Sequence, residues 1–153
     1  MFESYNEEVR RALFYGRYEA HRLSSRAIEP EHFLLGILRE GEKAVVKLFR
    51  RFGVRPNELR REIVGERAVA DRLSATPELS LSQESKEALV HATREAELLG
   101  HPFVGGEHLV IGILRVEECR GARILRQHGL DVGRVREQVA SKSPLDRILS
   151  GPY

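Results

Sequence analysis

The chain has 153 residues, of which 41% are hydrophobic and 31% charged, enough apolar material for one packed domain with a well-solvated surface. Its formal net charge of +2 is nearly balanced, so charge alone gives no argument for a nucleic-acid partner. The single cysteine, Cys119, excludes an internal disulfide and a zinc site built from several cysteines. The sequence also lacks an apolar run of membrane-spanning length and a signal-peptide pattern. We therefore expect a cytoplasmic protein without membrane or nucleic-acid partners.

The N-terminal half of the sequence predicts four helices. The first opens at Asn6, a good N-cap residue followed by two acidic residues, and its apolar positions run to Leu23. The second begins at Pro30 and is apolar nearly all round, which is typical of a buried central helix. The third covers residues 43–52 and is followed by Gly53, a residue suited to a left-handed C-cap. The fourth covers residues 56–64.

The same order of elements returns 76 residues later, beginning at Ser82. Residues 6–64 align with residues 82–140 without a gap, and 16 of these 59 positions are identical. The most similar segment is EHFLLGILR at residues 31–39, which returns as EHLVIGILR at residues 107–115. Two copies are too few for a solenoid. We predict an all-α fold of about eight helices, built as a pseudo-twofold duplication of a four-helix repeat.

The repeat also suggests where the parts of the chain begin and end. We expect one domain over residues 1–142, with the first repeat at 6–64, a linker at 65–79 and the second repeat at 80–140, followed by a tail over 143–153. Gly36 and Gly112 stand in the middle of the two central helices, where glycine costs roughly 1 kcal/mol relative to alanine. We expect that the backbone of another helix approaches closely at these two positions.

The histidines, Cys119 and the arginine clusters are candidates for metal binding, catalysis and nucleic-acid binding, respectively. His32 and His108 follow acids on apolar helices, and a core histidine bonded to a backbone carbonyl is favoured over a metal ligand, because the histidines lack ligand spacing. Cys119 starts a helix, but no motif supports a nucleophile. The arginine clusters at 50–51, 60–61 and 120–126 alternate with glutamates and lack aromatic neighbours for base stacking, so solvated helix faces are favoured. We predict no enzyme activity, no cofactor and no metal.

The double motif resembles the Clp N-terminal domain, or Clp repeat domain, of the type found on ClpC unfoldases. That family usually has Gly-Thr-Glu-His-Ile-Leu-Leu-Gly-Leu, often preceded by Leu-Gly-His. Residues 99–108, LGHPFVGGEH, match this pattern better than residues 23–32, LSSRAIEPEH. The resemblance covers about residues 1–142. It implies an eight-helix bundle that docks substrate or adaptor proteins of the Clp chaperone–protease system.

Clp unfoldases continue into ATPase modules, whereas this sequence contains no Gly-x4-Gly-Lys-Ser/Thr phosphate loop. We therefore expect either a natural stand-alone protein or a piece excised from a larger one, and favour the first because the terminal residues 150–153, SGPY, do not resemble a common tag. An alternative function is an accessory subunit that docks on the Clp protease or unfoldase through its helical surface. The partners are proteins in both interpretations.

ClpC-like members are similar to receptors for phosphorylated arginine, with one pocket in each repeat. The resemblance implies that Glu31 and Glu107 hold the guanidinium, while backbone amides and the capping residues Asn6 and Ser82 hold the phosphate. A structural interpretation remains open for both glutamates, because a carboxylate at a helix start contributes about 0.3–1 kcal/mol by itself. The repeat does not distinguish the structural from the ligand-binding interpretation, because a duplication preserves glutamates of either kind.

The two copies differ immediately before the shared motif. In the first copy Pro30 has no amide hydrogen, and Glu29 adds a negative charge where a phosphate would approach. In the second copy Gly105 and Gly106 keep amides at a helix N-terminus, an arrangement that suits an anion, and Ser82 can donate a hydroxyl hydrogen. We therefore favour the second pocket. The candidate ligand-binding residues are Glu107, Gly105, Gly106 and Ser82, and then Glu31 and Asn6.

Overall fold

The computed structural model describes residues 4–65 and 78–141 of the chain. Within these ranges the chain forms eight helices and no strand, which confirms the predicted all-α fold. The first repeat holds α1 (Glu7–Arg22), α2 (Pro30–Glu40), α3 (Lys43–Arg51) and α4 (Pro56–Val64). The second holds α5 (Gln83–Leu98), α6 (Gly106–Arg115), α7 (Arg120–Gln127) and α8 (Val132–Ala140). Most of the expected linker and all of the expected tail lie outside the described residues.

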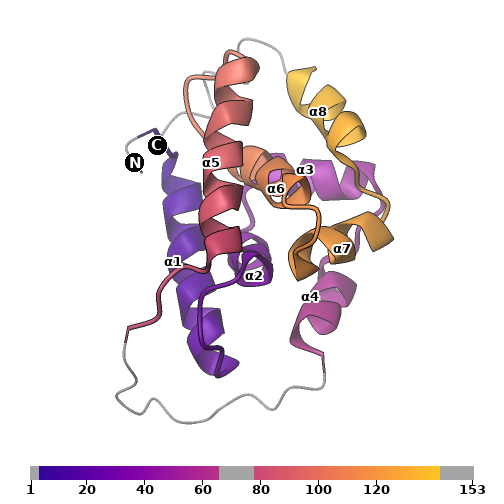
Figure 1. The fold of residues 1–153 in the computed structure, drawn as a ribbon. Helices are drawn as coiled ribbons and strands as arrows, with labels where there is room; N and C mark the ends of the chain where they lie inside the picture. Colours follow the sequence, from indigo (N-terminus) through magenta and orange to yellow (C-terminus); the bar gives the residue numbers. More distant parts are fainter. Residues whose placement is uncertain (1–3, 66–77, 142–153) are drawn as a thin grey trace.

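The two central helices, α2 and α6, form the core. Figure 1 shows them in the middle of the molecule, with α1 and α5 on one side and the other four helices on the opposite side. Leu34 and Leu35 of α2 and Leu109 and Ile111 of α6 are 0% exposed. Their apolar pattern therefore reflects burial on every face. None of the described helices is long and apolar enough to cross a membrane.

Close backbone contacts hold each central helix against the first helix of its own repeat. A Cβ atom added to Gly36 would lie 1.9 Å from the carbonyl oxygen of Ala12, and one added to Gly112 would lie 2.3 Å from that of Ala88. These distances are too short for any side chain, so only glycine permits the packing of α1 on α2 and of α5 on α6. The expected close approach at both glycines is confirmed.

The two repeats are joined by two short parallel bridges that cross from one repeat to the other. Tyr5, just before α1, pairs with Val104, just before α6, and Ile28, just before α2, pairs with Leu81, just before α5. Their hydrogen bonds include Val104 N–H to Ser4 O at 2.8 Å and Ile28 N–H to the residue 80 carbonyl at 2.9 Å. As a result, the first helix of each repeat begins beside the second helix of the other repeat.

Two buried glutamates fix the outer helices. Glu19 on α1 accepts a hydrogen bond from Arg60 on α4 at 3.0 Å. At the equivalent positions, Glu95 on α5 accepts from Arg136 on α8 at 3.0 Å and 2.5 Å. Both glutamates are 1% exposed or less. These pairs therefore link the first and fourth helices of each repeat.

Candidate functional site

The structure pairs the candidate site residues across the repeats. Asn6 lies with the start of α6, because its backbone amide donates to Val104 O at 3.0 Å. Ser82 lies with the start of α2, because its amide donates to Ile28 O at 3.1 Å. The assignment of Ser82 to the pocket of Glu107 is therefore wrong. We call the group around α6 the second site and the group around α2 the first site. The second site contains Asn6, Glu42, Gly105, Gly106 and Glu107; the first contains Glu29, Pro30, Glu31, Ser82 and Arg120.

Asn6 has both a capping role and a cross-repeat role in the second site. Its Oδ1 accepts the backbone N–H of Val9 at 2.8 Å, which caps α1 as the sequence predicts. Its Nδ2 donates to Oε1 of Glu42 at 3.0 Å. Asn6 is only 1% exposed, so both bonds are sheltered from water. The residue thus ties the start of α1 to a carboxylate from the start of α3.

Glu42 is a residue of this site that the sequence reasoning missed. It is the N-cap residue of α3, yet its side chain makes no capping bond there. Instead Oε2 accepts the backbone N–H of Gly106 at 2.9 Å, at the N-terminus of α6. The amide predicted to be free for an anion therefore already holds one, supplied by the other repeat. The neighbouring amide, that of Gly105, donates to Nδ1 of His108 at 2.8 Å. Both amides are therefore occupied, contrary to the expectation from the sequence.

The two glycines before Glu107 leave room for these groups. A Cβ atom added to Gly105 would lie 2.1 Å from Oε1 of Glu107 and 3.2 Å from Oε1 of Glu42. One added to Gly106 would lie 2.5 Å from a methyl carbon of Val45. Glu107 itself is 2% exposed. The glycine pair therefore lets two carboxylates and the start of α3 approach the start of α6.

The second site is acidic. Glu8, in the first turn of α1, has a raised pKa, first because it is partly buried and next because the carboxylate of Glu42 repels its charge. Glu107 adds a third carboxylate, which lies close to Gly105 as that of Glu42 does. A site of this composition attracts a cationic group such as a guanidinium. The Gly106 amide and Asn6 Nδ2 can bind an external anion only if Glu42 leaves them.

The first site contains an internal cation. Nη1 of Arg120, the first residue of α7, lies 3.8 Å from Oε2 of Glu31. The same guanidinium donates to the carbonyl oxygens of Ile63 at 2.9 Å and Glu62 at 2.8 Å. Glu31 is 6% exposed. Its carboxylate therefore lies near a guanidinium of the second repeat. At this position the sequence predicts the guanidinium of a ligand.

The hydroxyl groups of the first site are also engaged within the chain. Ser82 Oγ accepts the N–H of Ser85 at 3.1 Å and caps α5. It also lies 3.1 Å from Oγ of Ser85, which donates to Ile28 O at 2.7 Å. These bonds fasten the start of α5 to the segment before α2. The first site therefore reads as a structural junction between the repeats.

The histidines of the repeated motif have a structural role, but with a different partner from the expected one. Nδ1 of His32 accepts the N–H of Glu29 at 2.8 Å, and Nδ1 of His108 accepts that of Gly105 at 2.8 Å. Each histidine thus returns to the residue before its own helix, as in a capping box. Burial, and next the neighbouring His101, lower the pKa of His108 to about 3, so it is neutral.

No group of His, Cys, Asp or Glu in the described part of the chain is arranged to hold a metal ion. Cys119 is 1% exposed and caps α7 by accepting the N–H of Ala122 at 3.3 Å. Burial raises the pKa of this thiol, which is the opposite of the change that would activate a nucleophile.

Comparison with known proteins places these features in context. The family model of the Clp repeat (R) N-terminal domain matches residues 4–147. The chaperone protein ClpB of Oceanobacillus iheyensis is 31% identical over 139 residues, which are 91% of this chain and 17% of that protein. The negative regulator of genetic competence ClpC/MecB of Bacillus subtilis is also 31% identical, again over 91% of this chain and 17% of its own length. The chain thus spans about a sixth of the length of these relatives.

Solved structures agree on the fold. The Hsp104 N-terminal domain from Candida albicans aligns with a TM-score of 0.70 at 15% identity, over 91% of each chain. The N-terminal domain of ClpD from Arabidopsis thaliana aligns with a TM-score of 0.62 at 18% identity, over 97% of each chain. At these identities the likeness establishes the arrangement of the helices and leaves the sites to be argued from the residues themselves.

Proposed function

Because the chain belongs to the Clp repeat (R) N-terminal domain family, we propose that it is a non-catalytic module that binds substrate or adaptor proteins of the Clp chaperone–protease system. Its partners in this proposal are proteins rather than nucleic acids or membranes, and its place is the cytoplasm. The second site supports a binding role. There, hydrogen-bond donors from both repeats hold the carboxylate of Glu42, a group that the anionic part of a ligand can replace.

For the second site we propose a more specific ligand, an arginine side chain that carries a phosphate on its guanidinium. The cationic part of such a group suits Glu107, which is nearly buried beside Gly105. The anionic part suits Gly106 N–H and Asn6 Nδ2, the two donors that now hold Glu42. A phosphate carries up to two charges and three acceptor oxygens, so it is a stronger acceptor than a carboxylate.

The exchange requires Glu42 to leave the site. Burial, and next the nearby Glu42 carboxylate, raise the pKa of Glu8, and the Glu107 carboxylate also lies close to Glu42, so movement of Glu42 towards solvent would separate like charges. Glu42 is the residue before α3 and follows Gly41, whose backbone is left-handed with φ of 67°. In this proposal Glu42 competes with the ligand phosphate.

Calorimetric titration with free phosphoarginine tests the proposal. We expect binding to the unmodified chain, loss of binding in Glu107→Gln, and tighter binding in Glu42→Gln, because glutamine keeps an acceptor for Gly106 N–H without the competing charge. Glu118→Gln is the matched control, since Glu118 is the exposed residue that corresponds to Glu42 in the second repeat. Unmodified arginine and inorganic phosphate, titrated separately, show whether both halves of the ligand are needed.

Two results would contradict the phosphoarginine proposal. One is that neither the unmodified chain nor Glu42→Gln binds the compound. The other is that Glu107→Gln binds as tightly as the unmodified chain. Either result would leave protein binding as the proposed function, with the helical surface in place of the second site as the contact.

A further inference from the structure

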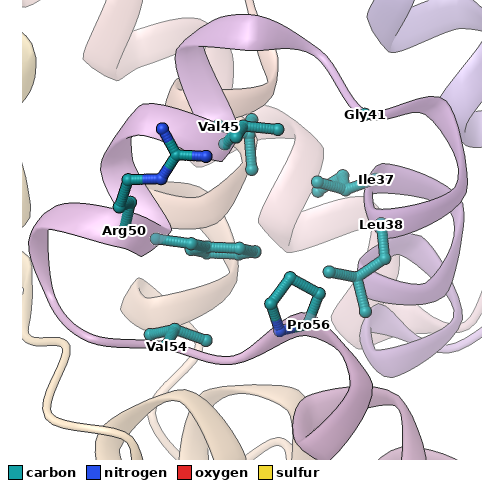
Figure 2. Close-up of a pocket in the computed structure, with 9 residues that line it drawn as sticks. Ile37, Leu38, Gly41, Val45, Arg50, Val54 and Pro56 are labelled. Carbon is teal, nitrogen blue, oxygen red and sulfur yellow. The ribbon is translucent and has the colours of Figure 1, made fainter.

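An apolar pocket lies between α2 and α3, next to the second site, whose Gly106 approaches the pocket residue Val45. Its volume is about 170 Å³. Figure 2 shows Ile37 and Leu38 of α2 facing Val45 of α3 across the space, with Val54 and Pro56 at one end. Phe49 also lines it, and Val45, Phe49 and Val54 are at most 4% exposed, so they form its floor. An apolar cavity of roughly 150 Å³ holds one benzene molecule, so this pocket has room for one large apolar side chain.

One lining residue of this pocket is basic, and so is the exposed side of α3; we call Lys43, Lys47, Arg50 and Arg51 together the basic rim. Arg50 lines the pocket directly, and Lys43, Lys47 and Arg51 are exposed on the same helix. Within the described residues these four side chains form no ion pair. α3 itself contains no acidic residue. The exposed side of α3 therefore carries four uncompensated positive charges around one exposed apolar residue, Val46, which is 40% exposed.

The acidic residues next to α3 do not neutralise this rim. Glu40 forms an ion pair with Arg11 at 2.7 Å, and Glu58 forms one with Arg55 at 3.4 Å. Glu42 accepts the N–H of Gly106 in the second site. Their charges are already committed within the chain. A partner that brings its own acidic residues would find the rim unopposed.

The corresponding helix of the second repeat is used differently. Gly121 and Ala122 stand where the first repeat has Val45 and Val46, and both are buried. A Cβ atom on Gly121 would lie 3.3 Å from the backbone nitrogen of Glu31, so α7 is packed against α2 at this point. Its Arg120 and Arg126 donate to carbonyl groups of the chain itself. Of the two equivalent helices, α3 is thus the one that keeps its cations and its apolar pocket available.

We propose that the α3 pocket docks an acidic segment of a partner protein, with one apolar side chain of that segment in the pocket and its aspartates or glutamates against Lys43, Lys47, Arg50 and Arg51. This inference rests on the proposed function only in that the chain binds proteins, and it does not involve Glu107 or phosphoarginine. The combination of one apolar pocket and an uncompensated basic rim defines the chemistry of the partner.

Fluorescence anisotropy with a labelled peptide tests the proposal on the full chain. The probe is a short peptide of aspartate, glutamate and glycine with one central phenylalanine. We expect saturable binding that weakens as salt is raised from about 50 mM to about 300 mM, because the ionic contacts are exposed. We expect about tenfold weaker binding in Arg50→Glu and in Val46→Asp, since both put a negative charge at the docking surface.

Matched controls separate the pocket from general effects. Val90→Asp places the same charge at a valine of α5 that is 45% exposed, and Arg123→Glu reverses an exposed charge on α7. Both controls should bind the peptide as the unmodified chain does. Peptides with serine in place of phenylalanine, or lysine in place of the acids, should bind at least about tenfold more weakly. Glu107→Gln should leave peptide binding unchanged, and Val46→Asp should leave phosphoarginine binding unchanged.

Several results would overturn this proposal. They are absence of saturable binding, equal binding of the lysine peptide, or equal effects of the pocket variants and their controls. Sedimentation velocity supplies a separate check. If the chain dimerises and Val46→Asp abolishes the dimer, then a second copy covers this surface and an acidic partner does not.

Discussion

At the scale of single residues, Gly36 and Gly112 are the positions where one methyl group has the largest predicted effect. Alanine favours a helix by roughly 1 kcal/mol over glycine, but a Cβ atom here would meet a backbone carbonyl at 1.9 Å or 2.3 Å. The helices would have to separate, so we expect Gly112→Ala to lower the free energy of unfolding by about 2 kcal/mol. Urea denaturation measures this change.

Gly133 provides the control for this prediction. It lies in α8, and the nearest atom to an added Cβ, Oδ1 of Asp131, is 3.5 Å away, an ordinary contact. Gly133→Ala should therefore raise stability by about 0.5–1 kcal/mol. If Gly112→Ala were as stable as the unmodified chain, the close packing of α5 on α6 would not be a constraint on the sequence.

His108 makes stability depend on pH. Burial lowers its pKa to about 3 in the folded chain, compared with 6.5 for an ordinary histidine. Between these values the unfolded chain binds more protons, so the contribution of His108 is fully present above pH 6.5 and is lost as the pH falls towards 3. From pH 7 to pH 5 this single group should lower the free energy of unfolding by about 2 kcal/mol.

Urea denaturation of the unmodified chain and of His108→Gln at pH 7 and pH 5 measures this term. We expect the loss of stability on acidification to be about 2 kcal/mol smaller in His108→Gln, because the difference between the two chains removes the contribution of other titrating groups. His21→Gln, at a half-buried histidine of α1, is the control. Equal pH dependence in all three chains would show that the pKa of His108 is the same in the folded and the unfolded chain.

At the scale of elements, the buried glutamates decide how the outer helices attach. Glu19 is 1% exposed and its closest cationic partner is Arg60 at 3.0 Å, with Arg22 farther away at 3.4 Å. Removal of Arg60 leaves the buried carboxylate with weaker compensation. We expect Arg60→Met to lower stability by about 2 kcal/mol, less than for a fully buried pair because Arg22 remains and Arg60 is partly exposed.

Arg61→Met is the matched control, because Arg61 is the exposed neighbour on the same helix. It should change stability by less than about 0.5 kcal/mol. Adding Glu19→Gln to Arg60→Met should recover part of the loss, since the uncompensated charge is then absent. Chemical denaturation of the four chains decides the matter, and equal stabilities of Arg60→Met and Arg61→Met would argue against a role for the pair in attaching α4.

The helices themselves are predictable from the sequence, because capping residues, apolar patterns and glycines are local features that the repeat shows twice. Arg60 shows the limit of such reasoning. It stands in an arginine cluster that predicts a solvated face, yet it bonds a buried glutamate of another helix. Identity of positions 19 with 95 and of 60 with 136 in the two repeats was the available indication of this contact.

The candidate site is less predictable, because a repeat shows which segments are equivalent and not which copies touch. Asn6 belongs with Glu107 only through the crossed bridges, which form between distant segments. Glu42 and Glu118 are equivalent and identical, yet Glu42 is held in the second site and Glu118 is exposed. The difference follows from their surroundings: Gly106 offers an amide to Glu42, whereas the equivalent Pro30 has none to offer.

At the scale of the whole molecule, the crossed contacts make each repeat dependent on the other. The start of α6 relies on Glu42 and on the backbone of Ser4, both from the first repeat. The start of α2 relies on Ser85 and on the residue 80 carbonyl, both from the second. Separating the repeats would leave these buried polar groups without partners and expose one side of each central helix. Each lost bond of this kind costs about 1–3 kcal/mol, a large share of the stability of a small domain.

We therefore predict that residues 4–65 and residues 78–141, prepared as separate polypeptides, do not fold alone. Each should have at most residual helix by far-ultraviolet circular dichroism, and its NMR spectrum should lack dispersed amide signals. Mixing the two in equal amounts should restore dispersed signals and one cooperative unfolding transition, because the crossed bridges and the Glu42 contact form between the pieces. Glu42→Ala in the first piece should weaken this association. Glu58→Ala should not, because Glu58 pairs with Arg55 of the same piece, at the surface. Cooperative unfolding of residues 78–141 alone would show instead that the second repeat is an independent domain and that the crossed contacts are incidental to its folding.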